Sequence, residues 1–415
     1  MNRFPTVVAI ALGAAVMLIA NPAPARDTAG NPGSQQTIGE RAYKRLEQAH
    51  TALGEKKYSE ALARLQQMEE LDLNDYERAL VYQTYGFLGV EQGQYGSAIE
   101  YFERCLSLEA LPDTAQQGML YSLAGLYSAE GRQQMTIDTL MRWLPNEPAP
   151  SPDAYIMLAA AHAELGQYPA ALPWVEKAVA GARQPKESWF QLLVAVYFET
   201  RDYSGAATAL RQMIALWPDK PGYWENLSGA YQQLGSDVEA VATMKLAWRR
   251  DLLKTESKLL NLARMMMYVE DPYQAGSLLD AEMQRGRVAR NRQNLELLLR
   301  AWTGAKEFDN AISVIDQLAP MTGDGEYYLR KAQLYAERAN WELVVPAAEQ
   351  AIARGGLRKA GAPWILKGMA EAELGRFKDA IDSLTEAKKY GDNFRRQAEG
   401  WLQFVNDRMQ VAARA

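Results

Sequence analysis

Small residues recur at a nearly constant interval through most of this chain, and that interval restricts the fold more than any other sequence feature. A small residue follows a polar or glycine-containing turn ten times, with gaps of 33 to 38 residues. The ten positions are Ala61, Ala98, Thr136, Ala171, Ala206, Ala240, Gly276, Ala311, Val344 and Ala380. An interval of about 34 residues is the length of one repeated helix pair. The sequence therefore predicts an array of stacked helix pairs.

The stretch from residue 224 to residue 247 is the clearest of these units. Its first half places four residues at the spacing i, i+3, i+4 and i+7, which is one face of a helix: Trp224, Leu227, Ser228 and Tyr231. Gly235 can adopt the left-handed conformation that ends a helix. Ala240 then allows the second helix to approach the first closely. Large residues fill the space between the two helices, and small residues set their distance.

This pattern resembles the tetratricopeptide-repeat (TPR) family, and the resemblance extends over residues 39–391. It implies an all-α fold, a right-handed superhelical TPR solenoid of about ten helix pairs. The first, third, seventh and ninth units match the pattern less well. In the seventh unit, the residues 270–272 (EDP) stand where a glycine turn is expected.

The two ends of the chain differ from the repeats. Residues 1–25 combine Arg3, an apolar run over residues 7–20 and a small-x-small site at 23–25, which is typical of a secretory signal peptide cleaved after Ala25. The apolar run is short for a bilayer, although retention as an anchor is the alternative. No later segment predicts a transmembrane helix. We expect the mature protein in a bacterial periplasm, with no transmembrane segment and peripheral association with an inner-membrane complex.

The predicted organisation has four parts: a signal peptide (1–25), a flexible arm (26–38), the TPR array (39–391), and a capping helix with a tail (392–415). Four prolines within residues 145–152 predict a break between the third and fourth units. The final helix is predicted from one apolar face, which would cover the open end of the stack: Phe394, Ala398, Trp401, Leu402 and Val405.

Enzymatic chemistry has little support in the sequence. The chain has two histidines, His50 and His162, and a single cysteine, Cys105. No zinc-ligand spacing, phosphate-binding glycine loop or nucleophile elbow occurs. We expect His162 and Cys105 to lie in the helix interfaces, and residues 265–267 (MMM) to fill the core rather than bind a soft metal. The predictions are no enzyme activity, no catalytic residue, no metal and no cofactor.

The charge pattern also restricts the partners. The formal net charge is −6, which argues against a general nucleic-acid binder. The densest basic cluster consists of Arg285, Arg287, Arg290 and Arg292. Contact with an anionic lipid or an acidic partner is one interpretation of this cluster, and a solvated loop is the other.

The TPR resemblance implies a peptide-binding groove lined by the first helix of each unit. The residues offset from the packing face are Gln83, Phe87 and Glu91 in the second unit, Tyr121 in the third, Gln191 and Phe198 in the fifth, and Glu225, Gln232 and Gln233 in the sixth. Amides, acids and a few aromatics suit an extended or helical peptide. The alternative for each is an ordinary hydrated surface.

Four segments narrow the resemblance to one group of exported TPR proteins. They are residues 37–43 (TIGERAY), 74–80 (NDYERAL) with 83–86 (QTYG), 185–192 (PKESWFQL), and 254–262 (KTESKLLNL) followed by 271–273 (DPY). These segments resemble the TPR proteins that accompany TonB, ExbB and ExbD in Gram-negative bacteria. The resemblance implies an accessory of energy transduction for the uptake of nutrients such as iron chelates, with TonB, ExbB or ExbD as partners. The alternative is a scaffold for envelope assembly, in polysaccharide export or cell-wall synthesis.

Overall fold

A computed structural model describes residues 37–414, so the predicted signal peptide and most of the predicted arm lie outside the described residues. These residues form α-helices and short 3-10 helices, with no strand in the described part of the chain. The chain divides into two compact units, of which unit 1 ends at Leu216 and unit 2 begins at Trp217.

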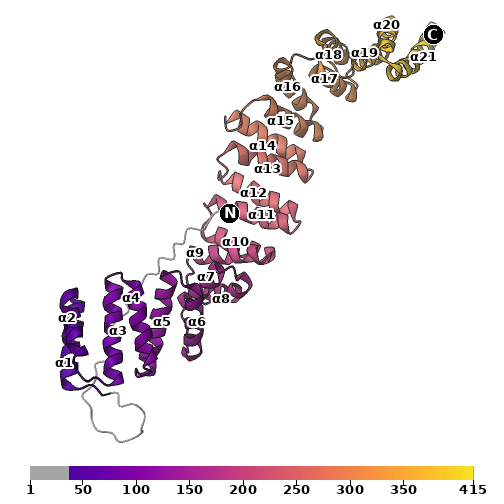
Figure 1. Cartoon of the computed structure of the whole chain (residues 1–415). Coiled ribbons are helices and arrows are strands. Elements are labelled where there is room, and N and C mark those ends of the chain that lie inside the picture. Colours follow the sequence, from indigo (N-terminus) through magenta and orange to yellow (C-terminus); the bar gives the residue numbers. More distant parts are fainter. Residues whose placement is uncertain (1–36, 415) are drawn as a thin grey trace. The chain divides into compact units, whose positions relative to one another are not determined.

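The helices of unit 1 follow one another with short connections (Figure 1). They are α1 (Glu40–Gly54), α2 (Tyr58–Glu69), α3 (Asp75–Glu91), α4 (Tyr95–Ser107), α5 (Asp113–Ala129), α6 (Gln133–Trp143), the 3-10 helix η1 (Leu144–Asn146), α7 (Pro152–Glu164), α8 (Tyr168–Gly181), α9 (Glu187–Glu199) and α10 (Tyr203–Leu216).

The helices of unit 2 follow the same plan. They are α11 (Pro221–Gln233), α12 (Asp237–Arg249), α13 (Glu256–Tyr268), α14 (Pro272–Gln284), α15 (Arg292–Gly304), α16 (Phe308–Leu318), η2 (Ala319–Met321), α17 (Glu326–Glu337), α18 (Trp341–Arg354), α19 (Ala362–Glu373), α20 (Phe377–Ala387), η3 (Lys388–Tyr390) and α21 (Asp392–Arg414).

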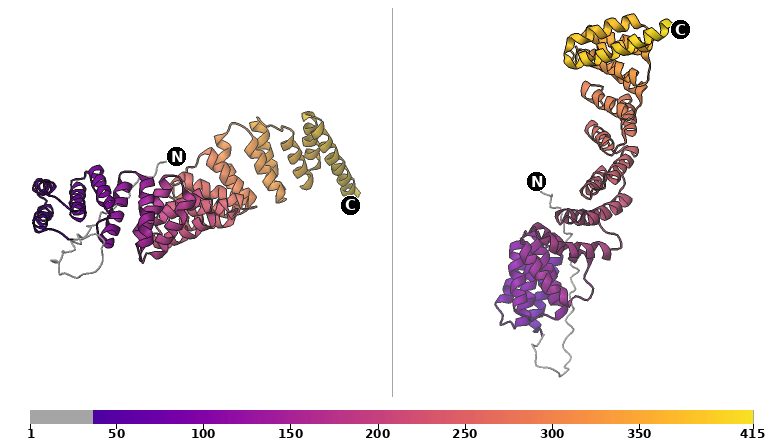
Figure 2. Two further views of the ribbon diagram at one scale, coloured as in Figure 1. Left: turned by 60° about the horizontal axis from the view of Figure 1, so that its bottom comes forward. Right: turned by 90° about the vertical axis from the view of Figure 1, so that its right-hand side faces the viewer.

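Consecutive helices pack as antiparallel pairs, and within each unit every pair also contacts the next pair along the chain (Figure 2). The described residues hold ten such pairs, from α1 with α2 to α19 with α20, followed by α21. The predicted all-α fold of about ten stacked helix pairs is therefore confirmed.

The ten small residues that mark the repeats are all buried and lie near the start of the second helix of each pair. Nine of them are the fourth residue of that helix, and Gly276 is the fifth residue of α14. A Cβ atom on Gly276 would lie 2.8 Å from the ring of Trp302 in α15, so glycine makes room for the indole of the next pair. The fourth residue of α14 is Ala275, which is fully buried, so the seventh unit keeps an alanine at the repeat position and the predicted marker Gly276 lies one residue beyond it.

The turn inside each pair contains one residue in the left-handed conformation. Glycine holds this conformation in five turns: Gly93, Gly131, Gly166, Gly235 and Gly375. A residue with a side chain holds it in the other five: Lys56, Arg201, Glu270, Lys306 and Ala339. Glu270 itself therefore makes the turn that lacks a glycine in the seventh unit, at a cost in backbone strain.

The proline-rich segment ends one pair and starts the next. The helix α6 ends at Trp143, η1 follows, and α7 begins at Pro152, whose fixed φ angle suits the first turn of a helix. The Ser151 hydroxyl accepts a hydrogen bond from the Ala154 backbone N–H at 3.3 Å and caps α7.

The last helix, α21, packs its apolar face against the pair α19–α20. Ala398 and Val405 are fully buried there, and Phe394, Trp401 and Leu402 pack around them. None of the described helices is both long enough and apolar enough to cross a bilayer.

Candidate functional site

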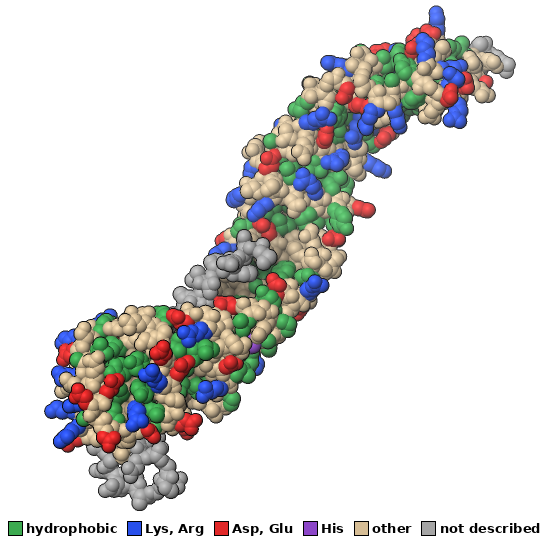
Figure 3. Space-filling view, viewed as in Figure 1, with side chains coloured by type: hydrophobic (Ala, Val, Ile, Leu, Met, Phe, Trp, Pro, Cys, Tyr) green, Lys and Arg blue, Asp and Glu red, His purple; other side chains and the backbone are tan. Residues whose placement is uncertain are grey.

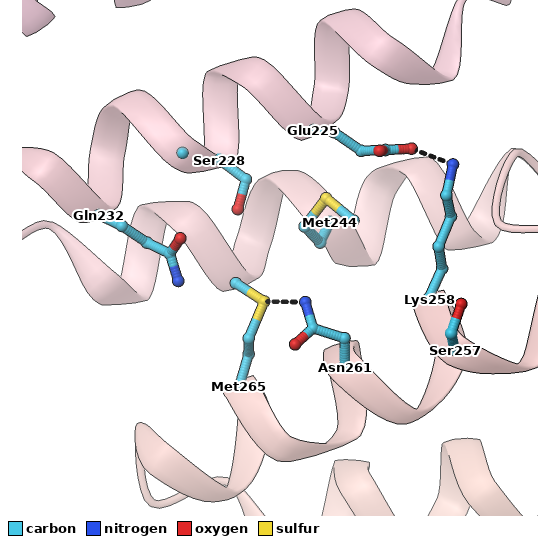
Figure 4. A pocket seen from close by; sticks show the side chains of 9 residues that line it. Glu225, Ser228, Gln232, Met244, Ser257, Lys258, Asn261 and Met265 are labelled. Carbon is cyan, nitrogen blue, oxygen red and sulfur yellow. Dashed lines mark hydrogen bonds and ion pairs between the residues drawn. The ribbon is translucent and has the colours of Figure 1, made fainter. Parts of the chain in front are cut away.

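The described part of unit 2 contains two adjoining hollows between the parallel first helices α11 and α13, with α12 beneath them. Their volumes are about 320 and about 430 Å³. Gln232 and Met265 line both hollows, so the two form one continuous groove. We call it the α11–α13 groove. Figure 4 shows the side chains that line its first hollow.

Each wall of the groove is one face of a helix. The α11 wall consists of Glu225, Ser228, Gly229 and Gln232, at the spacing i, i+3, i+4 and i+7. The α13 wall consists of Ser257, Lys258, Asn261 and Met265. The opposite face of α13 packs in the core through Leu259, Leu262, Ala263 and Met266. Packing of one α13 face therefore leaves the other face to line the groove.

Three interactions at the first hollow define its polar character, and Figure 4 marks the one between Glu225 and Lys258 and the one between Asn261 and Met265. Glu225 and Lys258 form an ion pair from one wall to the other, with 2.5 Å between Oε1 and Nζ. The Ser228 hydroxyl donates a hydrogen bond to the Ala240 carbonyl at 3.0 Å, so it is already occupied within the helix pair. The amide of Asn261 lies 3.6 Å from the sulfur of Met265, which is a weak acceptor.

The second hollow has a free charge on each side. Asp237 and Val241 of α12 line one side, and Arg264 and Tyr268 of α13 line the other. Tyr268 leaves 75% of its surface exposed, which is unusual for a large aromatic side chain. The groove therefore combines an apolar floor, two side-chain amides, charges of both signs and an exposed aromatic side chain.

Nine residues are predicted to line a groove, and six of them lie in unit 1. Phe87 packs its ring edge-on against Phe102, with 5.3 Å between ring centroids, and Tyr121 packs against Trp143 at 5.1 Å. Burial raises the pKa of Tyr121. The remaining residues range from half-buried to exposed: Gln83 and Phe198 are half-buried, and Glu91 and Gln191 are exposed. Their contact with a partner stays a prediction.

The other three predicted residues lie in unit 2. Glu225 and Gln232 line the α11–α13 groove, whereas Gln233 is exposed on α11 outside its lining. Sequence reasoning missed the α13 wall, because the seventh unit is degenerate. Lys258 and Asn261 are three residues apart and alternate with the apolar residues of the core face. This helical spacing is the signal that could have predicted them as lining residues.

The methionine run does not behave as one core segment. Met266 is fully buried, as predicted, but Met265 lines the groove and Met267 is half-buried. The prediction that all three fill the core is therefore wrong for Met265. Consecutive residues on a helix point in different directions, so only one of the three faces the core.

The predicted basic cluster is engaged within the chain. Arg287 donates to both carboxylate oxygens of Glu282, which is fully buried, and also pairs with Asp251. Burial alone would raise the pKa of Glu282, but the bonds from Arg287 and Trp248 outweigh burial and lower that pKa. The other cations of the cluster also pair within unit 2: Arg285 with Glu282, Arg290 with Asp280, and Arg292 with Glu296. This cluster therefore holds the connection between α14 and α15 in place.

The remaining chemical candidates have structural contacts. Cys105 is buried, its thiol donates to the Ala79 carbonyl at 3.1 Å, and burial raises its pKa to about 12. The prediction that Cys105 lies in a helix interface is confirmed. His162 is half-buried and bonds to Gln167 at 2.8 Å instead of packing fully in the interface. No cluster of His, Cys, Asp or Glu among residues 37–414 has the geometry of a metal site.

The two units differ in charge. Residues 37–216 carry 15 basic and 23 acidic residues, whereas residues 217–415 carry 28 basic and 27 acidic residues. Figure 3 shows charged side chains of both signs interspersed with apolar ones on the drawn face. Unit 1 carries a net negative charge and therefore favours basic partners. Unit 2 is nearly neutral, so its choice of partner depends on the positions of individual charges.

Two family models, both described as tetratricopeptide repeat, match this chain over residues 79–110 and 193–251. The first match covers most of α3 and all of α4, and the second runs from α9 to the residues just beyond α12. No curated protein matches the sequence of the chain.

Several solved structures resemble parts of the chain. The MamA protein is 22% identical over 42% of this chain and 92% of its own, with a TM-score of 0.36. A tetratricopeptide repeat protein from Parabacteroides merdae is 14% identical over 63% of this chain and 98% of its own, with a TM-score of 0.36. YrrB, described as a TPR protein with an unusual peptide-binding site, is 16% identical over 46% of this chain and 93% of its own, with a TM-score of 0.37.

The matched repeats agree with the helix pairs in the structure. Residues 79–110 include Ala98, and residues 193–251 include Ala206 and Ala240, which are three of the buried small residues that set the helix distances. The chain therefore contains tetratricopeptide repeats over residues 79–110 and 193–251.

Proposed function

We propose that this chain is a periplasmic scaffold that binds protein partners and serves TonB-dependent energy transduction for the uptake of nutrients such as iron chelates. Tetratricopeptide-repeat proteins are generally non-catalytic scaffolds that bind other proteins. The observation that carries the protein-binding part is the α11–α13 groove, where two residues expected from the sequence, Glu225 and Gln232, line one wall. Mixed charges and amides above an apolar floor suit a polypeptide.

The TonB part of the proposal is supported by the four segments that resemble the exported TPR group. Two of these segments contact each other: the backbone N–H of Gly39 donates to Glu77 at 2.7 Å, and the amide of Asn74 donates to the Thr37 carbonyl at 3.0 Å. Asn74 and Glu77 also form a capping box at the start of α3. These contacts are structural, so the segments support kinship more than they identify a binding surface.

The proposed role follows from how a repeat array holds a partner. Stacked helix pairs present a long row of side chains, and each pair contacts only its neighbours, so different partners can bind at different pairs. In this role the chain would hold periplasmic segments of TonB or ExbD while ExbB and ExbD use the proton gradient to drive TonB.

A binding experiment tests this function. The mature chain, beginning at Arg26, would be mixed with the separate periplasmic parts of TonB and of ExbD, and association would be measured by calorimetry and co-purification. We expect binding to at least one of them at micromolar concentrations, and lower receptor-dependent iron uptake in a strain that lacks the protein. Absence of binding to both, together with unchanged uptake, would exclude the TonB role. Binding to proteins of polysaccharide export or cell-wall synthesis would instead support an envelope-assembly scaffold.

A further inference from the structure

We propose that the α11–α13 groove seats a partner segment with one large apolar side chain between an acidic and a basic side chain. The occupant is a segment of a protein partner, and the groove selects it by the order of its acidic and basic side chains. This inference rests on the proposed protein-binding function but not on TonB as the partner.

The centre of the groove is suited to an apolar anchor. Met244 lies at the floor with 4% of its surface exposed, Met265 lies on the α13 wall, and Val241 extends the apolar surface into the second hollow. Thioether side chains are flexible and polarizable, so they adapt to anchors of different shape. An apolar side chain that inserts here would be covered on several sides.

A glycine on the α11 wall leaves room for the partner. Gly229 lies inside α11, where glycine weakens a helix relative to alanine. A Cβ atom added to Gly229 would have no heavy atom within 4 Å, so packing within the protein does not require glycine. The same open space faces the first hollow, which Gly229 lines. A missing side chain at this place makes the wall recessed and allows a partner backbone to approach closely.

The charges of the groove differ from one wall to the other. The α13 wall carries two cations, Lys258 and Arg264, and the opposite side carries two anions, Glu225 of α11 and Asp237 of α12. Lys258 and Glu225 neutralise each other across the first hollow. Arg264 and Asp237 have no ion pair in the described part of the chain, so they are available to a partner. An acidic partner side chain therefore fits beside Arg264 and a basic one beside Asp237, which sets the orientation of the segment.

Two amides and one aromatic complete the site. Gln232 lies where the hollows meet, and Asn261 lines the first hollow from α13, so both can pair with partner backbone groups. Tyr268 stands at the rim with most of its ring exposed. Tyrosine is enriched among the residues that dominate binding energies, and a bound segment would bury this ring.

A peptide selection tests the assignment directly. A display library of random peptides, each of about ten residues and so long enough to follow one helix when extended, would be selected on the mature full-length chain. We expect the enriched peptides to share a large apolar residue between an acidic and a basic residue. Their affinities would be measured by fluorescence anisotropy with labelled copies of the selected peptides.

Filling the recess separates binding from folding. Gly229→Met is expected to weaken the selected peptides at least about tenfold, while the thermal midpoint stays equal or rises because glycine leaves the helix. Gly118→Met is the matched control, because Gly118 lies in α5 and also has open space around its Cβ position. The control should bind as the unchanged chain does. The double variant Asp237→Arg with Arg264→Glu should prefer peptides with the two charges exchanged.

Two results would overturn the assignment. One is selection without an enriched class of peptide, and the other is equal binding by the unchanged chain and by Gly229→Met. These outcomes are distinct from failure of the proposed function. Peptides that require an open Gly229 recess would support the groove even if TonB and ExbD did not bind. Binding of TonB that Gly229→Met leaves unchanged would keep the function and remove the groove.

Discussion

At the scale of single residues, the turn inside each helix pair shows how backbone geometry can outweigh side-chain preference. Every pair places one residue in the left-handed region, five residues before the buried small residue in nine pairs and six before it in the α13–α14 pair. Glycine adopts this conformation without a steric penalty, whereas other residues pay one. The five turns without glycine are therefore places where the array stores local strain.

The turn between α17 and α18 provides a test of that strain. Ala339 has a φ angle of +52° and is exposed, so Ala339→Gly should remove strain without loss of packing. We expect the free energy of unfolding to rise by about 1 kcal/mol, since relief of the left-handed conformation exceeds the added entropy of glycine. Urea denaturation would measure it. Gly235→Ala, the reverse change in another turn, should lower stability, and a gain there would contradict the strain argument.

At the scale of elements, the distance between two helices depends on the small residue at their closest approach. Ala240 is fully buried in α12, and the Ser228 hydroxyl of α11 bonds to the Ala240 carbonyl. Few atoms separate the two backbones here. A larger side chain at this position has no free volume to occupy, because protein interiors are close-packed.

A pair of substitutions in α12 tests this packing. Ala240→Leu should lower the free energy of unfolding by about 1–3 kcal/mol through overpacking. Ala242→Leu lies in the same helix at an exposed position, and its effect should stay within about 0.5 kcal/mol. Chemical denaturation of both variants provides the comparison. Equal losses would mean that the assigned register of the repeat is wrong.

The connection between α14 and α15 depends on one buried carboxylate. Arg287→Met would leave Glu282 with Arg285 and Trp248 but without its bidentate partner, and a broken buried ion pair costs roughly 3 kcal/mol. Arg292→Met removes an exposed ion pair with Glu296 and a side-chain contact with Tyr327, and its cost should be under about 1 kcal/mol. Urea midpoints of the two variants measure the difference. Similar midpoints would show that the connection does not depend on Glu282.

At the scale of the whole molecule, each helix pair is stabilised by its neighbours, so a local change propagates mainly to adjacent pairs. Each of the two units has its own packed helices. Stability of the chain therefore depends on the weakest pairs as well as on the average. The contact of His50 in the first pair with Thr84 makes the stability of unit 1 depend on pH.

His50 makes unit 1 sensitive to acid. This residue belongs to α1, its Nε2 is 2.9 Å from the hydroxyl of Thr84 in α3, and burial lowers its pKa. The folded state therefore prefers the neutral imidazole, and the unfolded state binds more protons near its ordinary pKa. Stability is full above the unfolded pKa and falls as pH decreases through it. Urea unfolding between pH 7.5 and pH 5.5 should show this loss, and His50→Gln should reduce it. An equal pH dependence in both proteins would exclude His50 as the cause.

Much of the architecture followed from local patterns, but the groove did not. The buried positions of Ala98 and Ala240 were readable from their spacing, because a helix repeats its faces every few residues. Glu225 and Gln232 were found by the same logic, since they are offset from the packing face of α11. Lys258 and Met265 were not predicted to line the groove, because the repeat pattern of the seventh unit is too weak to show which face of its first helix packs in the core.

The sequence by itself determined the helix pairs, their number and the small residues between them, because these features depend on periodicities within one stretch of chain. Tertiary structure decided which surfaces stay open. The α11–α13 groove needs two helices from different pairs and the floor of α12, and the space at Gly229 exists only after these helices pack. Residues that are 33 positions apart, such as Glu225 and Lys258, become neighbours through this packing, and no local pattern records that contact.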